Sequence, residues 1–83
     1  MRLDKYLKVS RIIKRRTVAN EACDGERVSL NGKTAKAGSV VKIGDIIEIR
    51  FGDKRTKYEV LAISEHTAKS DAALMYRALT SDA

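Results

Sequence analysis

The apolar positions at the N-terminus of the chain recur with a helical period. Leu3, Tyr6 and Leu7 are spaced at i, i+3 and i+4, which is the stripe of a short amphipathic helix. Asp4 falls in the first turn of this helix, where the helix dipole favours a carboxylate. Val9 and Ser10 then interrupt the pattern. The first ten residues therefore predict a short helix with one buried face.

A second helical pattern follows and is predicted from about Arg15 to Asp24, with Gly25 as a helix stop. Arg16 and Asn20 are four residues apart and point together from a face that differs from the buried one. Small side chains on the buried face allow the two helices to approach closely. The predicted buried face consists of Ala19, Ala22 and Cys23.

From Arg27 onwards the period changes from helical to two. Val28 and Leu30 alternate with polar residues, and Asn31-Gly32 is a strong signal for a tight hairpin turn. Two further strands are predicted at 46–51 and 58–63, with turns at Gly44-Asp45 and Gly52-Asp53. The alanine-rich tail from Ala68 to Leu79 is predicted to be helical. Its apolar stripe would consist of Ala72, Met75, Tyr76 and Leu79.

The order of these elements predicts an α+β fold in which two N-terminal helices pack on a small bent antiparallel β unit, followed by a C-terminal helix. With 83 residues and no linker or repeat, we expect one domain over residues 1–83. No apolar run approaches the roughly 20 residues that span a bilayer. The N-terminus lacks the pattern of a secretion signal. We therefore expect a cytoplasmic monomer that has no contact with membranes.

The charge of the chain gives the first indication of its function. The formal net charge is +6 and the sequence pI is about 9.7, which indicates a polyanionic partner. The first 42 residues hold 11 Lys and Arg against 4 Asp and Glu, whereas the last 41 residues hold 6 against 7. Seven cations fall within the first sixteen residues and only Asp4 opposes them. A solvated surface normally mixes both signs, so this asymmetry favours RNA binding over simple solubility.

The predicted contacts are mostly cations, because arginine makes planar bidentate contacts with phosphate and lysine supplies mobile charges. All four aromatic residues are predicted to lie in the core, which leaves no stacking platform for single-stranded bases. We therefore expect recognition of RNA backbone and shape. The candidate RNA-binding residues are Arg2, Lys5, Lys8, Arg11, Lys14, Arg15, Arg16, Asn20, Lys33 and Lys36.

Catalysis finds little support in the sequence. His66 is the only histidine and falls in a polar stretch, without a partner that would position it for acid–base chemistry. Cys23 is the only cysteine and is expected to be a buried thiol rather than a nucleophile. The five glycines lie singly at turns, and no phosphate loop, nucleophile elbow or zinc-ligand spacing is present. We expect neither an enzyme nor a metal or cofactor site.

The ordered set of motifs resembles the S4 RNA-binding domain, whose core is called the alpha-L motif. The resemblance covers roughly residues 2–50, and β structure with a closing helix would fill residues 51–83. One departure is that the family's glycine, two residues before the first hairpin valine, is replaced here by Glu26, with Gly25 preceding it. The matching motifs are Arg2-Leu3-Asp4-Lys5-Tyr6-Leu7, Lys14-Arg15-Arg16-Thr17 with Ala19 and Asn20, Val28-Ser29-Leu30-Asn31-Gly32-Lys33, and Gly44-Asp45.

The resemblance implies that the basic face of the two helices lies on structured RNA. Carried onto this chain, the helical contacts would be Arg2, Lys5, Arg15, Arg16 and Asn20, with Lys33 and Lys36 assisting. Among small stand-alone members, the chain resembles the heat-shock protein 15 group and, more closely, the ribosome quality-control P (RqcP) group.

The RqcP resemblance implies binding to a 50S large ribosomal subunit that is obstructed by peptidyl-tRNA. There the protein would contact both large-subunit rRNA and the tRNA, and support alanine tailing of the stalled chain by the partner RqcH. Two alternatives stay open at this point. One is a general rRNA-binding assembly factor or RNA chaperone, and the other is a protein–protein adaptor that uses the C-terminal apolar stripe.

Overall fold

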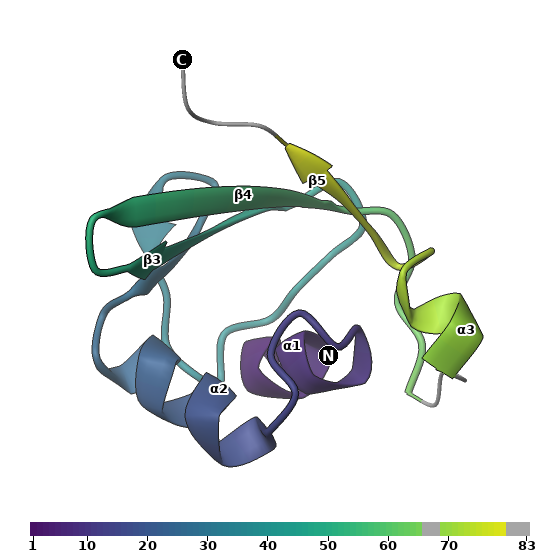
Figure 1. The fold of residues 1–83 in the computed structure, drawn as a ribbon, viewed down its shortest axis with the longest axis horizontal. Coiled ribbons are helices and arrows are strands. Elements are labelled where there is room, and N and C mark those ends of the chain that lie inside the picture. Colours follow the sequence, from purple (N-terminus) through teal and green to yellow (C-terminus); the bar gives the residue numbers. More distant parts are fainter. Residues whose placement is uncertain (66–68, 80–83) are drawn as a thin grey trace.

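A five-stranded antiparallel sheet covered on one face by two helices forms the body of the molecule (Figure 1). The computed structural model describes residues 1–65 and 69–79. The sheet has the strand order β2-β1-β3-β4-β5. The helices are α1 (Leu3–Val9), α2 (Arg16–Asp24) and α3 (Lys69–Ala72). The strands are β1 (Val28–Leu30), β2 (Lys33–Thr34), β3 (Ile46–Phe51), β4 (Lys54–Val60) and β5 (Tyr76–Leu79). None of the described helices is long and apolar enough to cross a membrane.

Both N-terminal helices form where their apolar spacing predicts them. In α1 the stripe of Leu3, Tyr6 and Leu7 is fully buried. Helix α2 begins one residue after the predicted start, because Arg15 has extended backbone angles. Its predicted inner face is buried as well, and small side chains there let the two helices pack closely.

The hairpin signals are confirmed by backbone geometry. Asn31 and Gly32 between β1 and β2 have φ angles of 52° and 85°, as a two-residue turn with both central residues left-handed requires. Strand β3 has the predicted bounds. Strand β4 differs from the prediction over 58–63, because its pairing with β3 continues to the Gly52-Asp53 turn and ends at Val60.

The predicted C-terminal helix is wrong beyond Ala72. Its first predicted residue, Ala68, lies outside the described residues, and α3 ends after four residues. The chain then forms β5, which pairs antiparallel with the edge of β4. This pairing satisfies backbone groups along that edge and brings the rings of Tyr58 and Tyr76 into an edge-to-face contact with centroids 5.3 Å apart. The tertiary context therefore outweighs the local helix propensity of the alanines.

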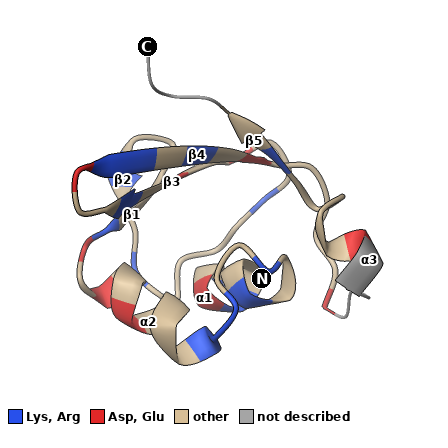
Figure 2. Cartoon of the chain, in the orientation of Figure 1, with Lys and Arg blue, Asp and Glu red and all other residues tan. Residues whose placement is uncertain are grey.

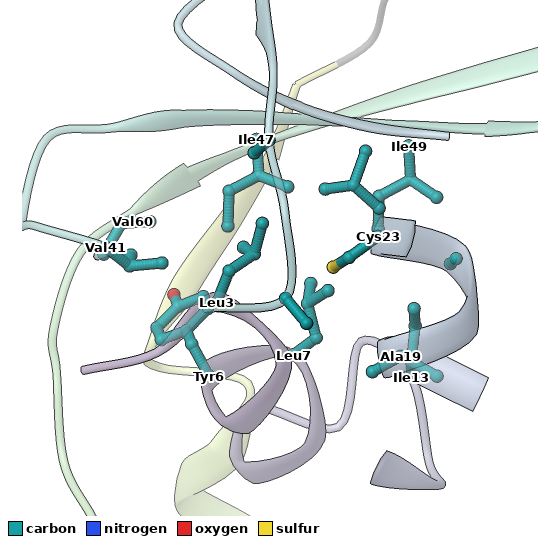
Figure 3. Packing of buried hydrophobic residues seen from close by; sticks show 14 of the residues in the cluster. Leu3, Tyr6, Leu7, Ile13, Ala19, Cys23, Val41, Ile47, Ile49 and Val60 are labelled. Carbon is teal, nitrogen blue, oxygen red and sulfur yellow. The ribbon is translucent and has the colours of Figure 1, made fainter. Parts of the chain in front are cut away.

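The core lies between the inner face of the sheet and the helices α1 and α2 (Figure 3). Ile47 and Ile49 of β3 face the N-terminal helices. Met75 belongs to the same buried cluster, and Ala72 is buried as well. The Tyr6 hydroxyl donates a hydrogen bond of 2.7 Å to the Met75 carbonyl, which ties α1 to the C-terminal segment. The stripe predicted for a C-terminal helix thus divides into two buried residues and the half-buried Tyr76 and Leu79 of a strand.

The aromatic residues do not all lie in the core. Tyr6 is fully buried, and Tyr58 and Tyr76 are half-buried. Phe51 is 49% exposed, so its predicted core position is wrong. It continues the inward alternation of Ile47 and Ile49, but it is the last residue of β3 and lies opposite Lys54 at the hairpin end. The strand extends past the part of the sheet that the helices cover.

Candidate RNA-binding surface

A buried carboxylate joins the two N-terminal helices. Asp4 is 2% exposed, and its Oδ1 atom accepts a hydrogen bond of 3.1 Å from Arg2 Nε. Its Oδ2 atom accepts bonds from Arg16 Nε at 3.4 Å and from Asn20 Nδ2 at 3.3 Å. The backbone N–H of Lys5 donates to Oδ1 at 2.8 Å. One side chain therefore positions groups from both helices.

The same contacts decide the ionisation of Asp4. Burial by itself raises the pKa of the carboxyl, but hydrogen bonds from Asn20, Arg2 and the Lys5 N–H lower it, and so does the charge of Arg16. The lowering contributions outweigh the burial, so the pKa lies below its usual value of 3.8. Asp4 is an anion at neutral pH, as an anchor for two guanidinium groups must be.

The anchored arginines remain open to solvent. The side chains of Arg2 and Arg16 are 55% and 49% exposed, although Asp4 between them is buried. Arg16 contacts Asp4 only through its Nε atom, which leaves both terminal nitrogens available to another acceptor. Such a pre-oriented guanidinium suits bidentate contact with a phosphate. The arginines border an open depression of about 490 Å³, which is lined by Arg2, Asp4, Arg16, Thr17, Asn20 and Glu21.

Other predicted contact residues from the N-terminal segment are arranged less closely. Lys5 forms an ion pair of 2.6 Å with Glu65, so its ammonium group is directed to the C-terminal half and not to Asp4. Lys8 at the end of α1 and Arg11 after it are exposed, and Arg11 has a left-handed φ of 63°. Lys14 and Arg15 are exposed directly before α2. These cations extend the positive surface without joining the anchored group.

The two predicted contact lysines of the β region, Lys33 and Lys36, lie in different places relative to the helices. Lys33 is on the edge strand β2. Lys36 precedes Ala37, whose carbonyl accepts the N–H of Asp4 at 3.2 Å, so this loop runs beside the start of α1. The structure thus brings Lys36 to the same end of α1 as Arg2, whereas Lys33 stays on the sheet (Figure 2).

Of the two residues considered for catalysis, Cys23 and His66, the structure describes only Cys23. Cys23 is buried, and burial, followed by the charges of Asp4 and Asp24, raises the pKa of its thiol to about 11. The thiol is therefore protonated at neutral pH and a poor nucleophile. His66 lies outside the described residues. Among the described residues, no three His, Cys, Asp or Glu side chains gather as metal ligands.

The sequence interpretation missed the role of Asp4 as an anchor. It treated this residue as a favourable charge in the first helical turn and as the only opposition to seven cations. One signal was available, because Asp4 follows the buried Leu3 and so lies at the edge of the face that packs on α2. A carboxylate at such an edge requires donors from the neighbouring helix.

Two short helices on an antiparallel sheet, with anchored arginines on the outer side, define a small RNA-binding protein of the S4 class. The S4 domain family matches residues 1–47, and the chain belongs to this family. The predicted resemblance is thereby confirmed.

Several known proteins are similar to this chain over most of its length. The chain is similar to the RQC P-site tRNA stabilizing factor of Streptococcus pneumoniae, with 54% identity over 80 residues that cover 96% of this chain and 91% of that protein. The protein of the same name from Bacillus subtilis is 53% identical over 79 residues, covering 95% and 92%. Among solved structures, the trimeric Heat Shock Protein 15 of Vibrio cholerae superposes with a TM-score of 0.85 at 32% identity, covering 95% of this chain and 81% of that one.

Proposed function

We propose that this protein is a non-catalytic RNA-binding factor of bacterial ribosome-associated quality control. It binds a large ribosomal subunit obstructed by peptidyl-tRNA, contacts both rRNA and the tRNA, and holds the tRNA in place. The relatives named as stabilizing factors of the P-site tRNA support the substrate. The pair of arginines fixed on Asp4 is the observation that carries RNA binding in this chain.

The proposed mechanism is differential binding without chemistry. A ligand shifts an equilibrium only when it binds one state better than the other. Cations held by a buried carboxylate match one arrangement of phosphates better than mobile side chains would, because less side-chain entropy is lost on contact. The factor therefore favours the tRNA position in which both RNA backbones lie against it. By keeping that position populated, it supports alanine tailing of the stalled chain by RqcH in the cytoplasm, and it acts as a monomer.

Sedimentation tests the proposal. The protein is expected to migrate with free large subunits that retain peptidyl-tRNA and to be lost from subunits from which the tRNA has been released. The double variant R2A/R16A should weaken this association, whereas K42A, which removes an exposed cation outside the predicted contacts, should not. Equal binding to vacant subunits or to assembly precursors would instead favour a general assembly factor.

The dependence on salt provides a second test. If about six phosphates are neutralised, the logarithm of affinity falls with the logarithm of salt concentration at a slope of roughly −4 to −5. The predicted contacts reach backbone, so R16A should lower affinity for different RNA sequences equally. Binding that ignores salt would contradict the proposal, and a change of base preference in R16A would indicate direct readout.

A further inference from the structure

The side-chain amide of Asn20 lines the depression beside the anchored arginines, and its orientation is fixed. Its Nδ2 atom donates a hydrogen bond of 3.3 Å to Asp4 Oδ2. Asp4 is an anion and can only accept hydrogen bonds, so the opposite orientation of the amide would bring two acceptors together. The carbonyl oxygen of Asn20 therefore faces away from Asp4. The buried carboxylate thus orients a hydrogen-bond acceptor as well as two guanidinium groups.

The carbonyl oxygen of Asn20 is open to a ligand. Within the described part of the chain, no donor contacts this oxygen. The residue is half-buried, and every fully buried side-chain nitrogen or oxygen of such described residues has a partner. An oxygen without a partner is therefore reached by solvent. The depression that it lines has a volume of about 490 Å³, which lies in the range of about 300 to 1,000 Å³ that is usual for small-ligand sites.

The depression has donors at one level of α2 and acceptors one turn later. Asn20 follows Arg16 by four residues, so it lies on the same face about 6 Å further along the helix axis. Glu21 follows Thr17 at the same separation, and both line the depression. Glu21 is exposed, and among the described residues its carboxylate has no hydrogen bond or ion pair. One end of the depression therefore attracts an anion, whereas the other end accepts hydrogen bonds and repels anions.

Phosphate groups alone do not suit both ends. Phosphate oxygens fit the guanidinium groups of Arg2 and Arg16, but they bring no donor to Asn20 Oδ1 and are repelled by Glu21. The ribose 2′-hydroxyl is the donor that an RNA backbone offers, and DNA lacks it. Because each sugar is bonded directly to its phosphate, a phosphate on the arginines brings a ribose to the next turn of α2. The edges of paired bases lie deeper in a folded RNA and are less accessible than the sugars.

We propose that the depression binds one ribose-phosphate unit of RNA, with the phosphate on Arg2 and Arg16 and the ribose 2′-hydroxyl donating to Asn20 Oδ1. The site thereby distinguishes RNA from DNA without reading the base sequence. Glu21 keeps phosphate away from the sugar end, so the backbone is held in one register. This inference rests on the proposed function and deepens it, because it names the chemical group that the surface at Asp4 recognises.

Replacement of the 2′-hydroxyl by fluorine tests the inference, because fluorine removes the donor and keeps the A-form helix. Fluorescence anisotropy with the full chain measures affinity for a ribose hairpin and for a 2′-fluoro hairpin of the same sequence. The wild type is expected to prefer the ribose hairpin. N20A should reduce the ratio of the two affinities by about fivefold, which is the effect of one neutral hydrogen bond. A purely structural role of Asn20 would lower both affinities by the same factor and leave their ratio unchanged.

Two control variants separate Asn20 from its surroundings. T17V removes a hydroxyl from the same depression, and K42A removes an exposed cation outside the predicted contacts. Both should keep the wild-type ratio, and circular dichroism confirms that each variant is folded.

The comparison of the two hairpins with wild type needs no variant, and equal binding of both overturns the inference. It is also overturned if folded N20A keeps the wild-type ratio or if T17V abolishes the preference. A preference seen with only one of two unrelated hairpin sequences would indicate a base contact, which overturns it as well. The proposed function fails on a different measurement, namely sedimentation with obstructed subunits.

Discussion

Replacing Asp4 with asparagine changes the affinity for RNA through two opposite effects of different size. Removal of a negative charge beside two arginines strengthens attraction to phosphate, by about 0.5 to 1 kcal/mol for partly solvated charges several ångströms away. The same change releases the guanidinium groups of Arg2 and Arg16 from their anchor. Ordering a flexible side chain at an interface costs roughly 0.5 to 1.5 kcal/mol. Two arginines therefore lose about 1 to 3 kcal/mol of pre-orientation.

The central value of the loss, about 2 kcal/mol, exceeds that of the gain, about 0.75 kcal/mol, so D4N is expected to bind RNA roughly eightfold more weakly than wild type, at 1.4 kcal/mol for each factor of ten. Stability should fall too, because an amide in place of the carboxylate cannot accept from all five donor atoms that contact Asp4. The arginines are half exposed and can be hydrated again, which limits the cost to about 2 kcal/mol. Fluorescence anisotropy with a labelled RNA hairpin measures affinity, and urea unfolding measures stability.

A double-mutant cycle shows whether Asp4 acts through the arginines. In an R2A/R16A background, D4N should have almost no further effect on affinity, since nothing remains to be positioned. Circular dichroism at the assay temperature confirms that each variant is folded. The reasoning is refuted if D4N binds RNA as tightly as wild type or more tightly. It is also refuted if D4N lowers affinity equally with and without the two arginines.

Three further predictions follow from the described contacts. Glu26 has a left-handed φ of 62°, so E26G should relieve about 1 kcal/mol of backbone strain, partly offset by the greater chain entropy of the unfolded state. The variant should therefore have a higher midpoint of urea unfolding, and a lower midpoint would show that no strain exists. Y6F should lower the free energy of unfolding by about 1 kcal/mol in the same titration. The loss stays small because the Met75 carbonyl still accepts the N–H of Leu61 when the Tyr6 hydroxyl is removed. The folded-state pKa of Asp4 lies below its usual value of 3.8, so its stabilisation is complete above about pH 5 and is lost as pH falls through the folded pKa. Acid unfolding followed by circular dichroism should show this loss in wild type and a smaller one in D4N.

The helices and the hairpins were predictable because their signals are local. The stripe of Leu3, Tyr6 and Leu7 specifies one helix face, and Asn31-Gly32 specifies a turn whose geometry few other residue pairs adopt. The left-handed Glu26 also explains the departure from the family pattern. The position still needs a left-handed residue, and this chain tolerates a side chain there while Gly25 adopts an ordinary φ of −81°.

The C-terminal strand was not predictable by the same reasoning. Tyr76 and Leu79 fit a helical stripe as well as they fit a strand, and only the free edge of β4 decides between the two.

Net charge is therefore an incomplete guide to how this protein meets RNA. The N-terminal segment contains seven cations and one carboxylate, and a count treats Asp4 as a loss of one positive charge. The structure gives the carboxylate the opposite role, because it is buried at the helix junction and fixes the two arginines that point to solvent. Free lysines such as Lys8 and Lys14 strengthen long-range attraction, which salt screens. A guanidinium held in place adds orientation, and orientation is what a factor needs when it must favour one position of a bound RNA over another.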